Sequence, residues 1–207
     1  EAVKFLASLA GMKPYTFSKQ DEEREKEWSA YKEIYKNYVD YFHDELLKNN
    51  NASSAKNYIK NRGLKLEDVQ NFKLGFATNE IDFYEHLLKK FNEKDIINSG
   101  IFYFDEKNKK YVNRFKERII FPINNISGDV IAIGGRAIKE NNYLAKYINS
   151  PETQFFKKGS NLYNLDKSRR LSNKLDYVYL VEGYMDVIGL YKNEIKNVVA
   201  NLGTSLT

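Results

Sequence analysis

Residues 177–203, YVYLVEGYMDVIGLYKNEIKNVVANLG, contain two apolar runs with a helical pattern between them. The runs YVYLV and NVVA are continuously apolar, which is typical of strands in a parallel sheet that is covered on both faces. The segment YMDVIGLYKN between the runs predicts a helix. We therefore predict a strand–helix–strand unit at this end of the chain and an α/β fold class for the protein.

Glu182 stands where the first of these strands is expected to end, and Gly183 and Asp186 follow it. In a doubly wound sheet, ligands gather beyond the carboxyl ends of the strands. We expect Gly183 to let the chain turn sharply, so that both acids point roughly the same way. Carboxylates are hard oxygen ligands that suit Mg²⁺ or Mn²⁺. The alternative for Asp186 is that it only complements the helix dipole.

The first third of the chain is predicted to be helical. Residues 22–50 form one long helix in this prediction, because large apolar side chains recur at spacings of three and four. NNNASS ends that helix, and a short helix capped by Ser53 or Ser54 runs to Gly63. Two more helices are expected over LEDVQNFKLGF and IDFYEHLLKKF. The apolar side chains of the long helix, expected mostly in the core, are Trp28, Tyr31, Tyr35, Tyr38, Phe42 and Leu46.

The period of the pattern changes near residue 101. IFYF and YVNRF, joined by the polar turn DEKNKK, predict a hairpin. RIIFPINN and VIAIGGRAI predict a second hairpin, in which Gly128 supplies the turn and β-branched residues fill both arms. The next segment, KYINSPETQFFKKGSNLYNL, has no clear period, and its Ser-Pro pair favours a loop.

The composition excludes several classes of function. The 207 residues are 42% hydrophobic, enough for one large domain or two small ones. Because the chain has no Cys, a thiolate metal site and a Cys nucleophile are excluded. No stretch approaches the roughly 18 apolar residues of a membrane span, and the first residues are too poor in basic side chains for a signal peptide. We expect a soluble, cytoplasmic protein without a membrane partner.

Charge and aromatic content favour a partner that carries phosphates and bases. The net charge is +5 at pH 7, the pI is ≈ 9.0, and 14% of the residues are aromatic. This combination suits nucleic acid. The alternative is that Lys and Asn are simply abundant, as in NEKDIINSG, and composition leaves both interpretations open.

Basic residues follow a regular pattern after the first hairpin. Arg114, Lys116 and Arg118 occupy alternate positions, so we expect them on one face of a strand or of its lead-in. Such a stripe can follow a phosphate backbone, and the alternative is a solvated charged face. Arg136 follows two glycines, which we expect to allow a ligand to approach closely. The expected loop adds Lys146, Tyr147, Asn149, Lys157 and Lys158, of which Lys157 is interpreted as a solvated surface residue.

These segments together resemble the catalytic core of bacterial DnaG-type DNA primases. The strings that carry the resemblance are RFKERIIFPI, GDVIAIGGRAI, KYINSPETQFFKKGSNLYNL, YLVEGYMDVIGL and NVVANLGTSLT, and it runs from about residue 25 to the end. The resemblance implies a mixed α/β subdomain followed by a TOPRIM fold, with a shallow active-site groove between them. We therefore expect a helical linker over residues 1–24, the N-terminal core subdomain over 25–172 and the start of TOPRIM over 173–207.

The resemblance also implies roles for single residues. Glu182 matches the TOPRIM acid implicated in metal-dependent catalysis, and Asp186 matches the second position of that motif. Lys116 and Arg118 match the ridge that guides single-stranded template, although Lys116 replaces the usual Arg and so loses its bidentate fork. Arg62 matches a template-side basic residue, and Arg114 is grouped with these. The region that binds the incoming nucleotide and alarmone nucleotides is matched by Arg136, Lys146, Tyr147, Asn149 and Lys158.

The expected activity is the synthesis of RNA primers from ribonucleoside triphosphates on single-stranded DNA, with Mg²⁺ or Mn²⁺. Two departures lead us to expect a fragment that is inactive alone. Nothing in the chain matches the zinc ribbon of the family, and the chain stops at NLGTSLT, before the Asp-x-Asp motif of TOPRIM. The helicase-binding region would come later still, and we expect a monomer.

Three alternatives stay open at this point. Another TOPRIM enzyme, a topoisomerase or nuclease, would share E-G-x-x-D but would not contain KYINSPET. A binding module without catalysis would have affinity for the template but no dependence on metal. A purely structural fragment would show neither property.

Overall fold

The computed structural model describes residues 2–12, 18–78, 82–139 and 145–203. Parts of three predicted segments lie outside these ranges: residues 1 and 13–17 of the linker, Ile81 at a helix start, and residues 204–207. The helices are α1 (Ala2–Leu9), α2 (Lys19–Lys48), α3 (Ser53–Asn61), α4 (Leu66–Asn71), α5 (Phe83–Leu88), α6 (Glu93–Asn98), α7 (Leu165–Leu175) and α8 (Tyr184–Tyr191), with short 3₁₀ helices η1 (Asn50–Ala52) and η2 (Lys158–Ser160). The strands are β1 (Gly75–Phe76), β2 (Phe102–Asp105), β3 (Lys110–Asn113), β4 (Arg118–Asn124), β5 (Val130–Ala137), β6 (Tyr147–Asn149), β7 (Tyr179–Val181) and β8 (Val198–Ala200).

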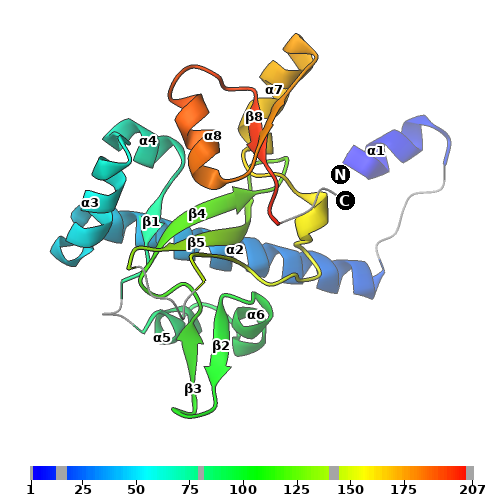
Figure 1. Cartoon of the computed structure of the whole chain (residues 1–207). Coiled ribbons are helices and arrows are strands. Elements are labelled where there is room, and N and C mark those ends of the chain that lie inside the picture. Colours follow the sequence, from blue (N-terminus) through cyan, green and yellow to red (C-terminus); the bar gives the residue numbers. More distant parts are fainter. Residues whose placement is uncertain (1, 13–17, 79–81, 140–144, 204–207) are drawn as a thin grey trace.

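The long helix α2 is the backbone of the first subdomain. It begins with a capping box, in which Ser18 and Asp21 each accept from the other's backbone N–H. The predicted apolar stripe of α2 is confirmed, because Tyr31, Tyr35 and most of the other side chains of that stripe are buried. The tyrosine hydroxyls reach distant backbone, as in Tyr31 Oη to Ile131 O at 2.7 Å, so the helix is both packed and hydrogen-bonded against the sheet. Figure 1 shows α2 passing behind β4 and β5.

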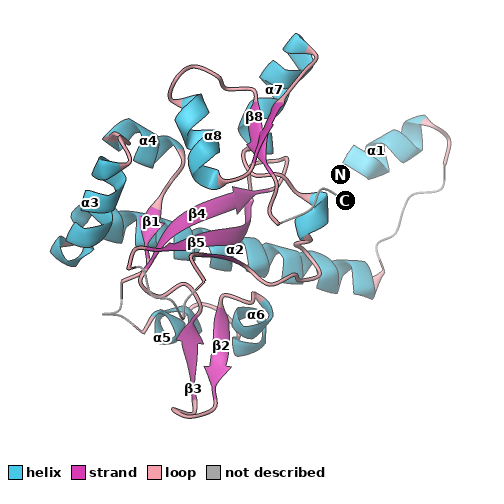
Figure 2. Cartoon of the chain, viewed as in Figure 1, coloured by secondary structure: helices cyan, strands magenta, loops and turns pink. Residues whose placement is uncertain are grey.

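Both predicted hairpins are present. β2 pairs with β3, and β4 pairs with β5, in antiparallel register, with Gly128 at φ +91° in the second turn. The second hairpin forms the centre of a four-stranded sheet in the order β1-β4-β5-β6. Figure 2 shows β4 and β5 side by side in this sheet. β6 was not expected, because its three residues lie inside a segment without a period. It forms because β5 offers a free edge to which these residues pair.

The two glycines of β5 serve packing and not ligand approach, so that expectation is wrong. A Cβ on Gly134 would lie 2.5 Å from Cζ of Tyr184, and one on Gly135 would lie 2.6 Å from Cδ1 of Phe115. The glycines therefore admit two aromatic rings from opposite faces of the sheet. Tyr184 in turn stacks on Phe121, with ring centroids 5.0 Å apart, and this packing joins α8 to the central sheet.

The predicted strand–helix–strand unit is confirmed, with one correction. β7 and β8 pair in parallel, and Leu180 stands opposite Val199. β8 is buried, but Tyr179 and Leu180 of β7 are 46% and 45% exposed, so β7 is not covered on both faces. The reason is that α7 and α8 both pack against β8, which leaves β7 at the edge of a two-stranded sheet.

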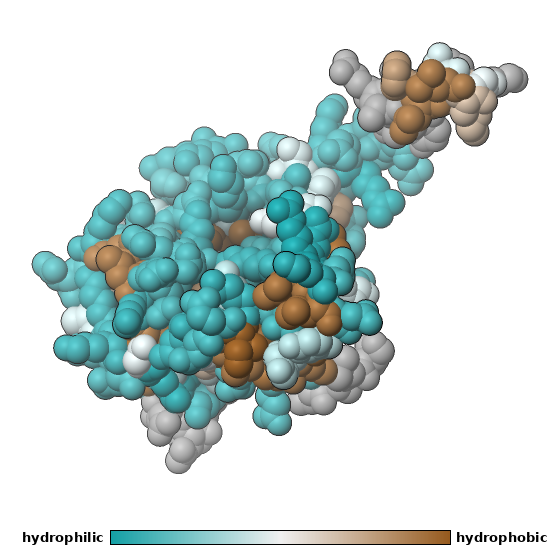
Figure 3. All heavy atoms as spheres, turned by 90° about the horizontal axis from the view of Figure 1, so that it is seen from above, coloured by the Kyte–Doolittle hydropathy of each residue, from teal (hydrophilic) through white to brown (hydrophobic). Residues whose placement is uncertain are grey.

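The surface near α7 and β7 has apolar areas within a mostly hydrophilic face. Figure 3 shows this face, seen from above Figure 1. Exposed apolar side chains of α7 and β7 include Leu175 and Leu180. α7 and α6 were not expected; α7 has a strongly polar sequence and buries only Ser168. No described helix is both long enough and apolar enough to cross a membrane.

Candidate functional site

Glu182 is the first residue beyond β7, at the carboxyl end of a parallel strand, and its side chain is exposed. Gly183 is the N-cap of α8 with φ −144° and ψ 170°, an extended conformation that any residue adopts. The expectation that a glycine is needed for a sharp turn here is therefore wrong. The position of the acid comes from where β7 ends, and not from special backbone at the residue after it.

Asp186 has a structural role at the start of α8. Its Oδ2 accepts the backbone N–H of Gly183 at 3.1 Å, which satisfies one of the free amide groups at the helix N-terminus. Asp186 therefore has a structural role at the helix start, which leaves its predicted role toward a metal ion untested. The residue is exposed nonetheless, so its second oxygen can still serve a ligand.

The two acids can form only part of a metal site. Across the described ranges, no group of three or more His, Asp or Glu side chains is placed to hold a metal ion. Mg²⁺ is commonly bound by one or two carboxylates together with waters and substrate phosphates. Glu182 and Asp186, both exposed carboxylates at a strand end, fit that partial donor set.

Arg136 is the most unusual residue of the site. Its side chain, on β5, is 4% exposed, and its Nε and Nη1 atoms are buried without a hydrogen-bond partner. Its Cζ lies 4.2 Å from the ring centroid of Tyr58 and 5.4 Å from that of Tyr147. A buried cation without an anion is costly unless a ligand supplies the anion. Arg136 therefore indicates an anion-binding site.

Tyr147 and Asn149 lie on one face of β6, beside Arg136 and Gly134 of β5. Asn149 accepts the hydroxyl of Tyr184 and donates from Nδ2 to Leu202 O at 2.7 Å, so it joins β6 to α8 and to the chain after β8. Burial raises the pKa of Tyr147, and the positive charges of Arg136 and Arg62 oppose that rise. The field of Asp186 also reaches this phenol and raises its pKa.

Arg62 and Tyr58 come from the end of α3. Arg62 is exposed, and its Cζ lies 5.4 Å from the Tyr58 ring. Arg62 and Arg136 therefore lie over the same ring, that of Tyr58. Arg62 was expected on the template side, and Arg136 was expected at the nucleotide. Sequence analysis missed Tyr58. Its spacing of four from Arg62 places both on one helix face, which is a signal that could have found it.

Arg114 and Lys116 lie in the lead-in to β4, as one form of the expectation allowed, and only Arg118 lies on the strand. β4 begins only at Arg118, and residues 114–117 form a turn in which Glu117 has φ 56°. Arg114, Lys116 and Arg118 nevertheless line one pocket of ≈ 480 Å³, which replaces the stripe with a cluster. Arg114 donates from Nε to Gly100 O at 3.1 Å, whereas Lys116 is exposed.

Arg118 is neither a free cation nor a solvated one. It is 7% exposed, and its Nη1 lies 2.9, 3.3 and 3.4 Å from the carbonyl oxygens of Ala145, Lys146 and Gly135. Burial lowers the pKa of its guanidinium. Arg118 thus fastens the start of β6 to the sheet, and it positions Lys146 and Tyr147.

The remaining predicted residues have fewer described contacts with Arg136 and Tyr147. Lys146 is exposed next to Tyr147. Lys158 begins η2, where its backbone N–H donates to Glu152 at 2.9 Å, and no described contact links its side chain to Arg136 or Tyr147. Lys157 is exposed and lies 3.8 Å from Glu152, in agreement with a solvated surface residue.

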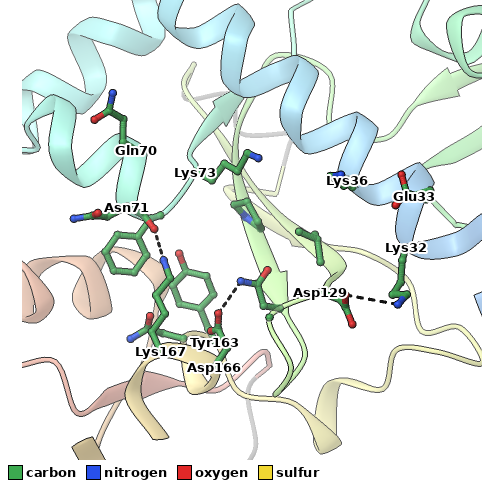
Figure 4. A pocket seen from close by; sticks show the side chains of 16 residues that line it. Lys32, Glu33, Lys36, Gln70, Asn71, Lys73, Asp129, Tyr163, Asp166 and Lys167 are labelled. Atoms are coloured by element: carbon green, nitrogen blue, oxygen red, sulfur yellow. Dashed lines mark hydrogen bonds and ion pairs between the residues drawn. The ribbon is translucent and has the colours of Figure 1, made fainter. Parts of the chain in front are cut away.

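A separate pocket of ≈ 560 Å³ lies between α2, the end of α4, the β4–β5 turn and the start of α7 (Figure 4). Several of its lysines already have partners. Lys32 lies 3.7 Å from Asp129, Lys73 pairs with Asp40, and Lys167 donates to Asn71 O. Desolvation lowers the pKa of Lys167. None of the predicted site residues lines this pocket.

Comparison with known proteins gives two family matches. The sequence model of the DNA primase catalytic core, N-terminal domain, matches residues 41–169, and that of the Toprim domain matches residues 176–207. The DNA primase of Lactococcus lactis is 38% identical over 209 residues, which cover 100% of this chain and 32% of the relative. That of Helicobacter pylori is 42% identical over 157 residues, covering 76% and 28%. The chain thus spans about a third of the length of such curated relatives.

Solved structures agree with these relatives. The RNA polymerase domain of Mycobacterium tuberculosis primase DnaG superposes with a TM-score of 0.80 at 26% identity, over 86% of this chain and 58% of that one. A DnaG primase catalytic domain bound to ssDNA gives a TM-score of 0.77 at 33% identity, over 88% and 58%. The Aquifex aeolicus primase, with zinc-binding and RNA polymerase domains, gives 0.77 at 32% identity, over 98% and 48%.

Proposed function

The chain belongs to the family of DnaG-type DNA primases, and we propose that it forms part of an active centre that joins ribonucleoside triphosphates on a single-stranded DNA template. The observation that carries this proposal is the buried guanidinium of Arg136, whose Nε and Nη1 have no hydrogen-bond partner. A triphosphate would supply the anion that this side chain lacks, through short, charge-assisted hydrogen bonds. Lys146 and Lys158 would add positive charge around the same phosphates.

Glu182 and Asp186 would hold a divalent ion, Mg²⁺ or Mn²⁺, shared with the triphosphate. When bound, the ion would help to activate the 3′-hydroxyl and to neutralise the leaving pyrophosphate. The residues of this chain would mainly bind and orient the nucleotide. Arg136 would contact a phosphate, while Tyr147 would limit the access of water to the guanidinium. Positioning of this kind supplies much of the rate in phosphoryl transfer.

The template would pass the cluster of basic residues at the β3–β4 turn. Lys116 and Arg114 would contact backbone phosphates, and Arg62 would meet the strand near the nucleotide. Arg118 is proposed to act indirectly, through the segment that it fastens. A relative bound to ssDNA supports this choice of template.

We further propose a chain that acts as a monomer in the cytoplasm, with its subdomains divided near residue 172. Zinc binding and helicase binding are proposed for other segments of a longer primase. Another TOPRIM enzyme, such as a topoisomerase or nuclease, is not proposed, because the family match over residues 41–169 is to a primase core.

The test of the proposed function is calorimetric titration of the 207-residue chain with GTP and Mg²⁺. Arg136→Gln should weaken binding by about 10–100-fold, because charge-assisted hydrogen bonds are lost from a buried site. Lys157→Gln is the matched control, since it removes an exposed positive charge outside the site. Equal affinity of the Arg136→Gln and unsubstituted chains would contradict the proposal.

A further inference from the structure

Tyr58 contacts both guanidinium groups of the site. Arg136 lies 4.2 Å and Arg62 5.4 Å from its ring centroid, and neither arginine forms an ion pair with another described residue. Two like charges near one ring repel each other, and nearby carboxylates would normally offset that repulsion. Here the negative face of an aromatic ring is the contact that attracts them.

The hydroxyl of Tyr58 does not explain why a tyrosine stands there. Its Oη is buried without a hydrogen-bond partner, so this atom is a cost to the fold. The residue is also only half-buried, so it is a minor part of the core. What the side chain does provide is a ring between two arginines, one from α3 and one from β5.

Tyr147, on β6, is the second aromatic residue beside Arg136. Its ring centroid lies 5.4 Å from Cζ of Arg136, so that this guanidinium has an aromatic ring from α3 and another from β6 near it. Aromatic surroundings hold the planar group in place without occupying its N–H donors. Those donors stay available for an anion.

We propose that Tyr58 is a positioning residue for both substrates of the site. Its ring holds Arg136 ready for a phosphate of the incoming nucleotide, and Arg62 ready for a phosphate of the template strand. This assignment rests on the proposed function. It names one residue that links nucleotide binding to template binding. A ring is required at position 58, and a hydroxyl is not.

The first experiment measures binding of Mg²⁺–GTP and of a single-stranded oligo(dT) to the 207-residue chain. Tyr58→Leu should weaken both by about fivefold to tenfold, the scale of a partly desolvated cation–π contact. Tyr58→Phe keeps the ring and should restore both affinities. Tyr111→Leu removes another half-buried ring, one stacked on Tyr84 away from both arginines, and should leave binding unchanged.

A double-mutant cycle separates positioning from a general loss of structure. In an Arg136→Gln background, Tyr58→Leu should weaken GTP binding by no more than about twofold, because the group that it positions is already gone. Effects that simply multiply would overturn the assignment. So would a Tyr58→Phe chain that binds as weakly as Tyr58→Leu.

A nuclear magnetic resonance measurement distinguishes failure of this assignment from failure of the proposed function. The Arg136 Nε–Hε signal should carry a ring-current shift that Tyr58→Leu abolishes and Tyr58→Phe retains. An unmoved signal overturns the role of Tyr58 even if GTP binds. Loss of the shift in a chain that binds neither GTP nor DNA supports the positioning of Arg136 and overturns the proposed function.

Discussion

Arg136 is a buried cation in the central sheet, with two aromatic rings beside it and no ion pair to any acid of the described segments. Such a residue is expected to lower the stability of the unliganded chain in exchange for ligand affinity. Ligand binding should recover that stability, because anything that binds only the folded state raises its melting temperature.

Arg136→Met tests this trade-off. Methionine fills a similar volume without a charge, so we expect the unliganded chain to gain about 1 kcal/mol, or roughly 2–4 °C in melting temperature. Binding of Mg²⁺–GTP should be lost at the same time. The check is thermal unfolding with and without GTP; a variant that melts lower than the unsubstituted chain would show that Arg136 stabilises the empty fold.

Glu182 presents the opposite case, an exposed side chain with no described packing role. Glu182→Gln keeps the shape and removes the charge, so the melting temperature should stay within about 1 °C. In a primase containing this segment, primer synthesis should fall by about a hundredfold, as when one preorganised electrostatic group is lost. Near-normal priming at saturating Mg²⁺ would remove Glu182 from the proposed metal site.

At the scale of elements, the short strand β6 carries much of the site, because Tyr147 and Asn149 both belong to it. Its three residues pair with β5, and Arg118 fastens the preceding backbone. A buried guanidinium that serves carbonyl oxygens is structural, and an exposed lysine is suited to a phosphate. Arg118 and its neighbour Lys116 should therefore give different phenotypes.

Arg118→Ala is expected to destabilise the chain by about 2–3 kcal/mol, because it removes buried packing and leaves carbonyl groups without a donor. Lys116→Gln should leave stability unchanged and reduce the salt slope of single-stranded DNA binding by roughly 0.7. Unfolding curves measure the stability of both variants, and DNA titrations at several salt concentrations measure their salt slopes. The assignment fails if Arg118→Ala melts like the unsubstituted chain and flattens the salt slope instead.

At the scale of the whole molecule, the site draws on α3, β5, β6 and α8, which are far apart in the sequence and meet on one face of the central sheet. The separate pocket beside α2 contains none of the predicted site residues, and two of its lysines, Lys32 and Lys73, form ion pairs (Figure 4). Within the described ranges, the metal donors are too few for a complete carboxylate cluster.

The 207-residue chain should consequently bind Mg²⁺–GTP and single-stranded DNA but make no primers by itself. Multi-carboxylate sites lose their activity as a unit when members are missing. Primer synthesis on single-stranded DNA, followed with labelled ribonucleotides, checks this expectation. Detectable primers from the purified chain would mean that two carboxylates suffice.

The sequence by itself determined the elements whose cause is local. The core stripe of α2, both hairpins and the β7–α8–β8 unit follow from side-chain periodicity and turn residues, which act over a few positions. Glu182 could be predicted at a strand end for the same reason. The resemblance also identified the family and Arg136, although not why Arg136 matters.

Only the tertiary structure decided how distant segments combine. β6 exists because β5 offers it an edge, and β7 is exposed because α7 and α8 both cover β8. Arg118 is buried, and Tyr58 lies between Arg62 and Arg136, because strands and helices dozens of residues apart pack together. Burial and hydrogen bonding depend on these long-range contacts. Local spacing therefore predicted one stripe of three basic residues, whereas packing gave Arg114 and Arg118 different carbonyl partners and left Lys116 exposed.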